Sequence, residues 1–583
     1  MKIPTRKIYE GRTYPLILCL VHLSILGIGV YMVDYFSKEE ISGILMRWVP
    51  WNLRINFLLI LMGTVICFHD IIGTFKGFVD RRGMLLAGLV ILAFLTTCYI
   101  TPRTHRIFFD EDIYGNIAQN IALADQAGYC NYGTFEYDEY TPHWITYNKQ
   151  PSGWPLLISL AFQLFGSNEV NAFFLNNVLF SLSTVLVFFI TWHLTGAYFT
   201  SFVSALAFAF MPHNLMWSNT AAAEPSAGFF AGVAVLSLII FLKTGKDRHL
   251  FLLAVLIPFA CQIRTESLLT FLWVIIAILT LSPRITISKG VWTCGFLITI
   301  FLLPHLLHIY SMGGESWGAE GDKFSPAFFW NNLHANGTYY LNNKQFPMLL
   351  TVLAIVGFLF SRHSMRWKGL ILAWFLLFWG VFLFFYAGSY KYGADVRFAL
   401  TSFMPLAILA GMGAGCIRDW IQDAISRTKD AGAKIPSAIS SFRFPVSSLL
   451  ILLILFSFMQ FLPLIRQEGQ EAWGARYDHK HAREFIKKIP RRSIVLTHIP
   501  TMFLLWKQSA IQTYAGINHP DLIEYLVKKY DGHVYFHYNY WCNTKTDRNT
   551  RLCQAIKERY MLKEIARAHE QDNEYALYQM GLK

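Results

Sequence analysis

Long apolar segments recur up to about residue 465, and they constrain the fold more than any other feature of the chain. A helix that crosses a bilayer needs about 20 apolar residues, and about 13 segments reach or approach that length. Charged residues make up only 15% of the chain, far below the roughly 25% of a soluble domain. We therefore predict an α-helical polytopic membrane protein with about 13 transmembrane helices, which begin near residues 15, 54, 84, 170, 199, 225, 250, 266, 291, 347, 369, 398 and 446.

The formal charge of +13 reflects membrane topology rather than nucleic-acid binding. Lys and Arg lie in short clusters between apolar segments instead of forming one basic face. Because cytoplasmic loops are enriched in these residues, their distribution predicts a cytoplasmic N-terminus. The same topology places residues 102–169 and everything after about residue 465 outside the cytoplasm.

The chain divides into two predicted parts. Residues 1–465 form the membrane domain, whose first outer loop, 102–169, contains two short apolar helices that we expect to lie at the membrane interface. Residues 466–583 have the composition of a soluble domain, and we predict a small extracytoplasmic α/β domain there. The two interfacial helices are expected over Tyr114–Ala127 and Trp154–Phe165. In the soluble domain we expect a helix that Asp478 caps and that runs to Lys488, and a second helix over Pro520–Tyr530. Strands are expected over Ser493–Ile499, Val534–Tyr540 and Tyr575–Met580.

Cysteine and histidine patterns in the C-terminal part are less specific. Cys542 and Cys553 share an oxidising compartment in this topology, which leaves open both a disulfide and two free thiols. His479 and His481 are interpreted as surface residues rather than metal ligands, because no neighbouring residues supply the remaining coordination. No cysteine spacing typical of a zinc site is present in the chain.

Charged residues recur on the outer side where apolar segments begin or end, whereas the segment interiors hold almost none. An ion-coupled transporter normally carries ionisable groups near the middle of the membrane, so this pattern favours chemistry at the outer surface. The most concentrated group is Asp110-Glu111-Asp112, which directly follows an apolar segment. Asp112 is assigned no role beyond the first turn of a helix, which acidic side chains stabilise.

From Asp110 to Gly166 the chain resembles the GT-C glycosyltransferases that use lipid-linked sugars, particularly the protein O-mannosyltransferase and lipid A aminoarabinose transferase branch. Asp110-Glu111, followed by Tyr114, Ala118 and Ile121, is similar to the acidic motif and Tyr-Ala helix of that branch. Lys149-Gln150-Pro151, followed by Pro155-Leu156-Leu157, is similar to its Lys-Pro-Pro-Leu segment. Asn148 departs from the carboxylate that aminoarabinose transferases tend to carry, which puts a metal site there in doubt.

The resemblance implies an inverting transfer of a sugar from a polyprenyl phosphate to a glycan, lipid or protein acceptor, in a bacterial inner (plasma) membrane. Such a displacement needs a carboxylate to accept the proton of the attacking hydroxyl, and Asp110 is the candidate base, with Glu111 in support. Cations must stabilise the phosphate that leaves, and Lys149, Arg264 and Arg397 are the candidates. Glu224 is expected to bind an acceptor hydroxyl or a divalent cation, and a metal requirement stays open.

Two other functions stay open beside this prediction. An oligosaccharide transferase with a pyrophosphate-linked donor is expected to show a strong metal site and a sequon reader. A glycolipid or polysaccharide flippase would move its substrate without a base at Asp110.

Overall fold

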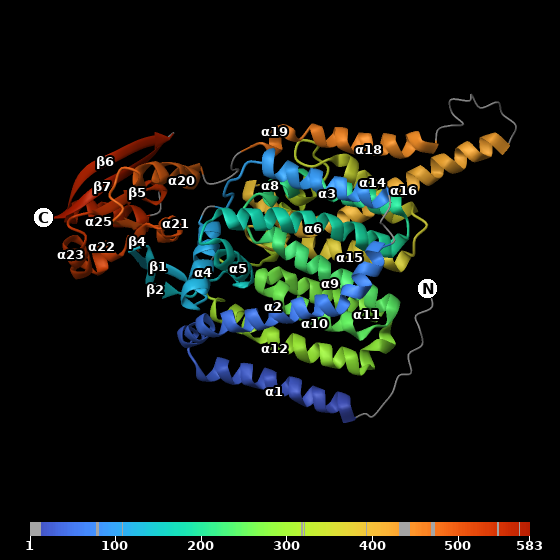
Figure 1. Ribbon diagram of the computed structural model, residues 1–583, viewed down its shortest axis with the longest axis horizontal. Coiled ribbons are helices and arrows are strands. Elements are labelled where there is room, and N and C mark those ends of the chain that lie inside the picture. The colour runs from blue at the N-terminus through green and yellow to red at the C-terminus, as the bar shows by residue number, and fades with distance from the viewer. Residues whose placement is uncertain are drawn as a thin grey trace.

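The computed structural model describes residues 13–76, 81–107, 109–315, 319, 321–391, 393–430, 443–467, 473–544, 547–570 and 572–583. Long helices lie side by side in one large body, and a smaller domain of strands and short helices lies at one end of it (Figure 1). Helix α1 begins at the opposite end of this body from the small domain (Figure 1).

Each of the 13 predicted segments falls within a helix. Among the described residues, seven helices are long and apolar enough to cross a membrane, and an eighth span arises if α7 and α8, bent by 61° at their junction, count as one. The prediction of a polytopic helical protein is confirmed. The count of 13 spans is not confirmed, because several of the helices are shorter than a membrane span requires. The helices are α1 (Thr13–Tyr35), α2 (Lys38–Lys76), α3 (Arg81–Tyr99), α6 (Val170–Thr195), α7 (Tyr198–Ala209), α8 (Pro212–Ser218), α9 (Glu224–Thr244), α10 (Asp247–Ile263), α11 (Leu268–Leu281), α12 (Lys289–Ser311), α13 (Phe329–Tyr339), α14 (Met348–Phe360), α15 (Met365–Val381), α16 (Leu400–Asp430), α18 (Arg443–Met459) and α19 (Leu462–Ile465), with 3-10 turns at Thr265–Ser267, Pro283–Ile287, Pro326–Phe328 and Gly393–Ala399.

Glycines allow α14 and α16 to pack backbone against backbone. A Cβ atom at Gly357 would lie 2.0 Å from the carbonyl oxygen of Leu409, and one at Gly413 would lie 1.9 Å from that of Leu353. Helices in membranes gain little from the hydrophobic effect between them, so such close approach through small residues is a common way to hold them together.

The first outer loop holds the two expected helices and a hairpin that was not predicted. Its elements are α4 (Asp110–Ala124), β1 (Tyr129–Glu136), β2 (Glu139–Thr146) and α5 (Gly153–Phe165). Strand β1 pairs with β4 of the C-terminal part, so the loop and that part share one sheet.

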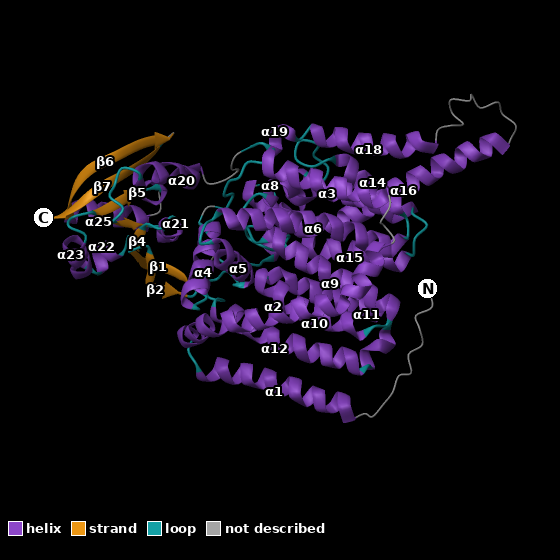
Figure 2. Ribbon diagram, viewed as in Figure 1, coloured by secondary structure: helices purple, strands orange, loops and turns teal. Residues whose placement is uncertain are grey.

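The C-terminal part forms a sheet with helices around it (Figure 2). The seven-stranded sheet has the order β2-β1-β4-β3-β5-β7-β6; β3 runs parallel to both neighbours and the other pairs are antiparallel. Asp478 lies inside α20 and does not cap it; its carboxylate instead accepts a hydrogen bond from the amide of Tyr540. The elements are α20 (Trp473–Ile486), β3 (Ile494–Thr497), α21 (Pro500–Leu505), β4 (Ser509–Gln512), α22 (Ala515–Asn518), α23 (Pro520–Lys529), β5 (Val534–Tyr538), α24 (Tyr540–Asn543), α25 (Asp547–Arg559), β6 (Tyr560–Glu570) and β7 (Asn573–Leu582).

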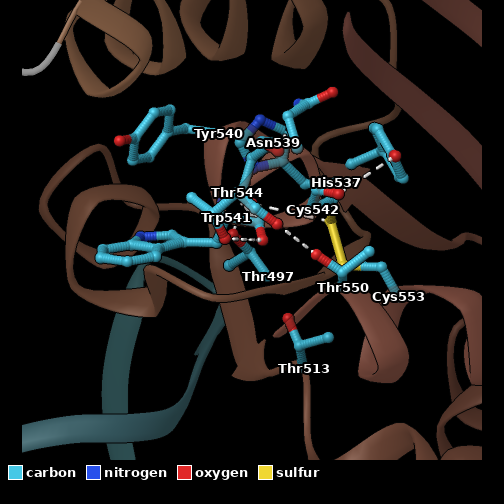
Figure 3. Close-up of a disulfide and its surroundings, with 12 residues drawn as sticks. Thr497, Thr513, His537, Asn539, Tyr540, Trp541, Cys542, Thr544, Thr550 and Cys553 are labelled. Atoms are coloured by element: carbon cyan, nitrogen blue, oxygen red, sulfur yellow. Dashed lines mark hydrogen bonds between the residues drawn. A yellow bond between two sulfur atoms is a disulfide. The ribbon is translucent and has the colours of Figure 1, made fainter. Parts of the chain in front are cut away.

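A disulfide joins two of these helices. Cys542 in α24 and Cys553 in α25 are bonded, and both are buried (Figure 3). Of the two possibilities that the sequence left open, the structure therefore has the disulfide. Cys130 is buried in β1 with a free thiol.

Candidate active site

A cavity of about 400 Å³ lies where the outer loop meets the ends of α10, α11 and α15. It brings together four of the predicted site residues, Asp110, Lys149, Arg264 and Arg397. Tyr114 also lines it, and burial raises the pKa of this phenol, which therefore stays protonated. The other lining residues are Gln150, Pro151, Thr265, Glu266, Leu268, Leu269, Phe324, Val381, Phe382, Phe385, Tyr386, Ala387 and Phe398, so much of the wall is apolar.

Asp110 is the first residue of α4 and is held from two sides. Its Oδ1 accepts a hydrogen bond of 2.9 Å from Nε2 of Gln150. Phe109, just before it, has a φ of 74°, a left-handed conformation that is unfavourable for a bulky residue. The Phe109 ring packs on Trp541 of the C-terminal part, with centroids 5.6 Å apart. Strained backbone of this kind concentrates at functional sites, where surrounding contacts hold it.

The two arginines of the cavity share one carboxylate. Nη1 of Arg264 lies 2.8 Å and Nε of Arg397 lies 3.2 Å from Oε1 of Glu224. Arg264 also pairs with Glu266 at 2.8 Å. Both arginine side chains remain about 15% exposed, and both guanidinium groups lie close to the ring of Phe398. They are thus fixed in place and still open to the cavity.

Glu224 itself is fully buried and is not part of the cavity wall. Its observed partners are the two arginines, so it acts here as their counter-charge and orients both of them. Binding of an acceptor hydroxyl or a divalent cation by Glu224 stays a prediction.

Glu111 also lies behind the cavity wall. Its Oε1 accepts hydrogen bonds from the amides of Arg106 and Ile107, and its Oε2 accepts one from the amide of Ala221. Nδ1 of His105 lies 3.1 Å from the same Oε2. These contacts tie the start of α4 to the preceding loop, which makes Glu111 a residue that positions Asp110. A direct part for Glu111 in catalysis stays a prediction.

Lys149 presents the third cation. No carboxylate lies within ion-pair distance of its ammonium group among the described residues. Its backbone carbonyl accepts a hydrogen bond of 3.1 Å from Nε2 of His308, which holds this part of the loop against α12. Lys149 therefore lines the cavity from a fixed backbone.

The structure also shows a buried cluster that the sequence analysis missed. His479 was interpreted as a surface residue, but its side chain is only 11% exposed and its Nε2 lies 3.0 Å from each oxygen of Asp112. Asp112 is fully buried, so its function extends beyond the first turn of α4. His481 is partly exposed and pairs with Glu570. A separation of 367 residues between Asp112 and His479 leaves no local pattern that could reveal their contact.

The pKa values in this cluster follow from burial and charge together. Burial opposes the charged form of Asp112, but the positive charge and hydrogen bond of His479 outweigh it and hold the carboxyl pKa below its usual value. Burial likewise opposes protonation of His105, but the hydrogen bond and charge of Glu111 raise its pKa above the usual value.

Comparison with known proteins gives one partial family match and several structures of similar fold. A sequence-family profile described as "Dolichyl-phosphate-mannose-protein mannosyltransferase" matches residues 149–308, a range that begins at Lys149. Among curated proteins, no sequence matches significantly. The structure is similar to ArnT from Cupriavidus metallidurans bound to undecaprenyl phosphate, with a TM-score of 0.53, 10% identity, and 86% of this chain and 98% of that chain covered.

The chain shares its fold with this ArnT. The apo form of the same ArnT gives a TM-score of 0.52 at 12% identity, with the same coverage of both chains. The oligosaccharyltransferase AglB from Archaeoglobus fulgidus, in complex with an inhibitory peptide and a dolichol-phosphate, gives a TM-score of 0.48 at 11% identity over 86% of this chain and 74% of that chain. At these identities the likeness to ArnT shows the fold of this integral membrane protein, and its cavity is the candidate site for substrates.

Proposed function

We propose that this protein is a GT-C glycosyltransferase, which transfers a sugar from a polyprenyl phosphate to an acceptor hydroxyl, with inversion, on the extracytoplasmic side of a bacterial inner membrane. One observation carries the proposal: a single cavity presents one carboxylate, Asp110, together with the cations Lys149, Arg264 and Arg397. A carboxylate and several cations are the two kinds of group that displacement of a phosphate at an anomeric carbon requires.

The reaction is assigned to these groups as follows. Asp110 accepts the proton of the acceptor hydroxyl as the hydroxyl oxygen bonds to the anomeric carbon. The bond between that carbon and the phosphate oxygen breaks, and the oxygen keeps the electron pair. Lys149, Arg264 and Arg397 stabilise the negative charge that develops on the phosphate, the two arginines by paired hydrogen bonds.

The cavity wall also suits a lipid-linked donor. Leu268, Leu269 and a group of phenylalanines line it beside the charged residues. An apolar wall next to fixed cations accommodates the first part of a polyprenyl chain and its phosphate together. Undecaprenyl phosphate bound to the similar ArnT supports the same class of donor.

Transfer assays on the purified protein test the proposal. The protein is reconstituted in liposomes, given a radiolabelled polyprenyl-phosphate sugar and a panel of glycan, lipid and peptide acceptors, and product formation is measured. Lys149→Met is expected to raise the KM for the donor and to lower the rate, because one phosphate contact is lost. Lys344→Met, an exposed lysine outside the cavity, is the matched control and is expected to behave as wild type.

Three results would contradict the proposal. Transfer only from a pyrophosphate-linked donor would favour an oligosaccharide transferase. Movement of the donor lipid across the bilayer without any sugar transfer would favour a flippase. If Lys149→Met and wild type had the same KM for the donor and the same rate, Lys149 would not be part of the donor site.

A further inference from the structure

Two buried histidines meet where the first outer loop packs against the C-terminal part. His105 precedes α4, and His479 lies in α20; their ring centroids are 4.6 Å apart. Asp112, in the first turn of α4, lies beside both of them. The three side chains come from the loop before α4, the first turn of α4 and α20, and all are at least about nine-tenths buried.

The atoms of this cluster have the spacing of a metal site. One ligand atom from each of His105, Asp112 and His479 falls within 4.8 Å of the other two. Nε2 of His479 lies 3.0 Å from both oxygens of Asp112. A tetrahedral zinc ion with ligands at about 2.0–2.1 Å separates neighbouring ligand atoms by about 3.3 Å, close to the 3.0 Å between His479 and Asp112.

The surroundings of His105 match those of a metal-binding histidine. Its Nδ1 lies 3.1 Å from a carboxylate oxygen of Glu111. With the ring proton donated to Glu111 from Nδ1, Nε2 carries the lone pair. A metal-bound histidine commonly donates its other ring N–H to a carboxylate in this way, which fixes the tautomer and the ring orientation.

Charge balance points in the same direction. Three carboxylates, Glu111, Asp112 and Glu169, adjoin the two imidazoles, and Glu169 also pairs with Arg483. A divalent cation between the two rings would offset the negative charge of these buried carboxylates.

We propose that His105, Asp112 and His479 bind a divalent transition-metal ion and that this ion joins α20 to the first turn of α4. Zinc is the ion that a set of two imidazoles and one carboxylate favours. Glu169, whose Oε2 lies 3.4 Å from Nε2 of His105, or a water molecule completes the coordination. Asp112 is two residues from Asp110, so the ion holds the segment that carries the candidate base. The ion is structural, because none of its ligands lines the cavity.

Metal analysis of the full chain tests this inference without any sugar-transfer assay, so its outcome is separate from that of the proposed function. The protein is produced without a polyhistidine tag, purified in detergent without chelator, and analysed by mass spectrometry for metal content. We expect about one zinc ion per chain for wild type. Asp112→Asn and His479→Gln are each expected to lower metal affinity by roughly tenfold or more.

His481→Gln is the matched control, since this histidine lies in the same helix and contacts Glu570 instead. It is expected to retain the wild-type metal content. Glu111→Gln, which removes the carboxylate partner of His105 and leaves the three proposed ligands in place, is expected to weaken binding by roughly 10- to 100-fold while some metal is retained.

A second measurement covers variants that fail to fold. Wild-type protein stripped with a chelator is titrated with Co²⁺, whose absorption spectrum reports tetrahedral coordination, and its thermal midpoint is followed with added Zn²⁺. We expect a tetrahedral Co²⁺ spectrum and a rise in the midpoint, because a ligand that binds only the folded state stabilises it. Stripped wild type that binds neither ion in the micromolar range, or His479→Gln that holds as much metal as wild type, would overturn the proposal.

Discussion

Replacing Glu224 with glutamine tests whether one buried carboxylate holds the two arginines of the cavity. Glu224 is fully buried, and its Oε1 lies 2.8 Å from Arg264 and 3.2 Å from Arg397. The glutamine side chain has the same size and can still accept a hydrogen bond. The substitution therefore removes the negative charge and little else.

The cost of this substitution follows from the geometry. At about 3 Å and an effective dielectric constant of about 20, each ion pair contributes roughly 5 kcal/mol before desolvation is counted. Removing one partner of a buried pair costs about 3–5 kcal/mol in net stability. Because both arginine side chains remain about 15% exposed, we expect the lower end, about 3 kcal/mol. For a chain of this length that unfolds as one unit, this corresponds to a fall of about 3 °C in the thermal midpoint.

The assay is differential scanning fluorimetry of the detergent-solubilised protein. Glu484→Gln, which removes an exposed ion pair with Lys487, is the control and should change the midpoint little. Added polyprenyl phosphate should restore more stability to Glu224→Gln than to wild type, because its phosphate replaces the missing counter-charge. If Glu224→Gln melted at the wild-type temperature, or if the phosphate stabilised both proteins equally, the ion-pair account of these arginines would be wrong.

Two further predictions concern the C-terminal part. Cys553→Ser removes a disulfide that closes a short loop, and we expect the free energy of unfolding to fall by about 2–3 kcal/mol. Reductant should lower the thermal midpoint of wild type and leave that of the variant unchanged. An equal response of the two proteins to reductant would contradict this prediction. His537 is buried, and burial, followed by the nearby histidines His498 and His481, lowers its pKa to about 3. Above pH 6.5 the histidine is neutral in both the folded and the unfolded chain, so it does not change the free energy of unfolding. Below pH 6.5 the unfolded chain binds a proton that the folded chain does not. The free energy of unfolding should therefore fall by about 1.4 kcal/mol per pH unit, or about 2 kcal/mol at pH 5. His537→Gln should show a shallower fall in midpoint between pH 7 and pH 5, and identical slopes would refute the assignment.

Much of the membrane part could be predicted because each helix carries its own apolar segment. Every predicted span lies in a helix, and the two short helices of the outer loop are present. The number of true spans could not be predicted, since helices such as α7 and α11 are too short to be judged by length alone. Hydropathy reports composition, whereas the depth of a short helix depends on its packing partners.

The candidate site was predictable in part for a similar reason. Four candidate residues each follow or precede an apolar segment, so the predicted topology places them at one level of the membrane. The cavity brings the four together: Asp110, Lys149, Arg264 and Arg397. The links behind the cavity were not predictable. Pairing of β1 with β4 and contact between Asp112 and His479 both join segments more than 360 residues apart, and no local periodicity reports such contacts.

The most direct test of the central claim is the rate of sugar transfer by Asp110→Asn. The variant is compared with wild type and with Asp125→Asn, which changes a largely exposed aspartate at the other end of α4. Single-turnover transfer is measured with saturating polyprenyl-phosphate sugar, and donor binding is measured separately. The account predicts that Asp110→Asn binds the donor as wild type does but transfers the sugar at least about 100-fold more slowly, the usual contribution of a general base, while Asp125→Asn transfers normally. Transfer by Asp110→Asn at the wild-type rate would contradict the account.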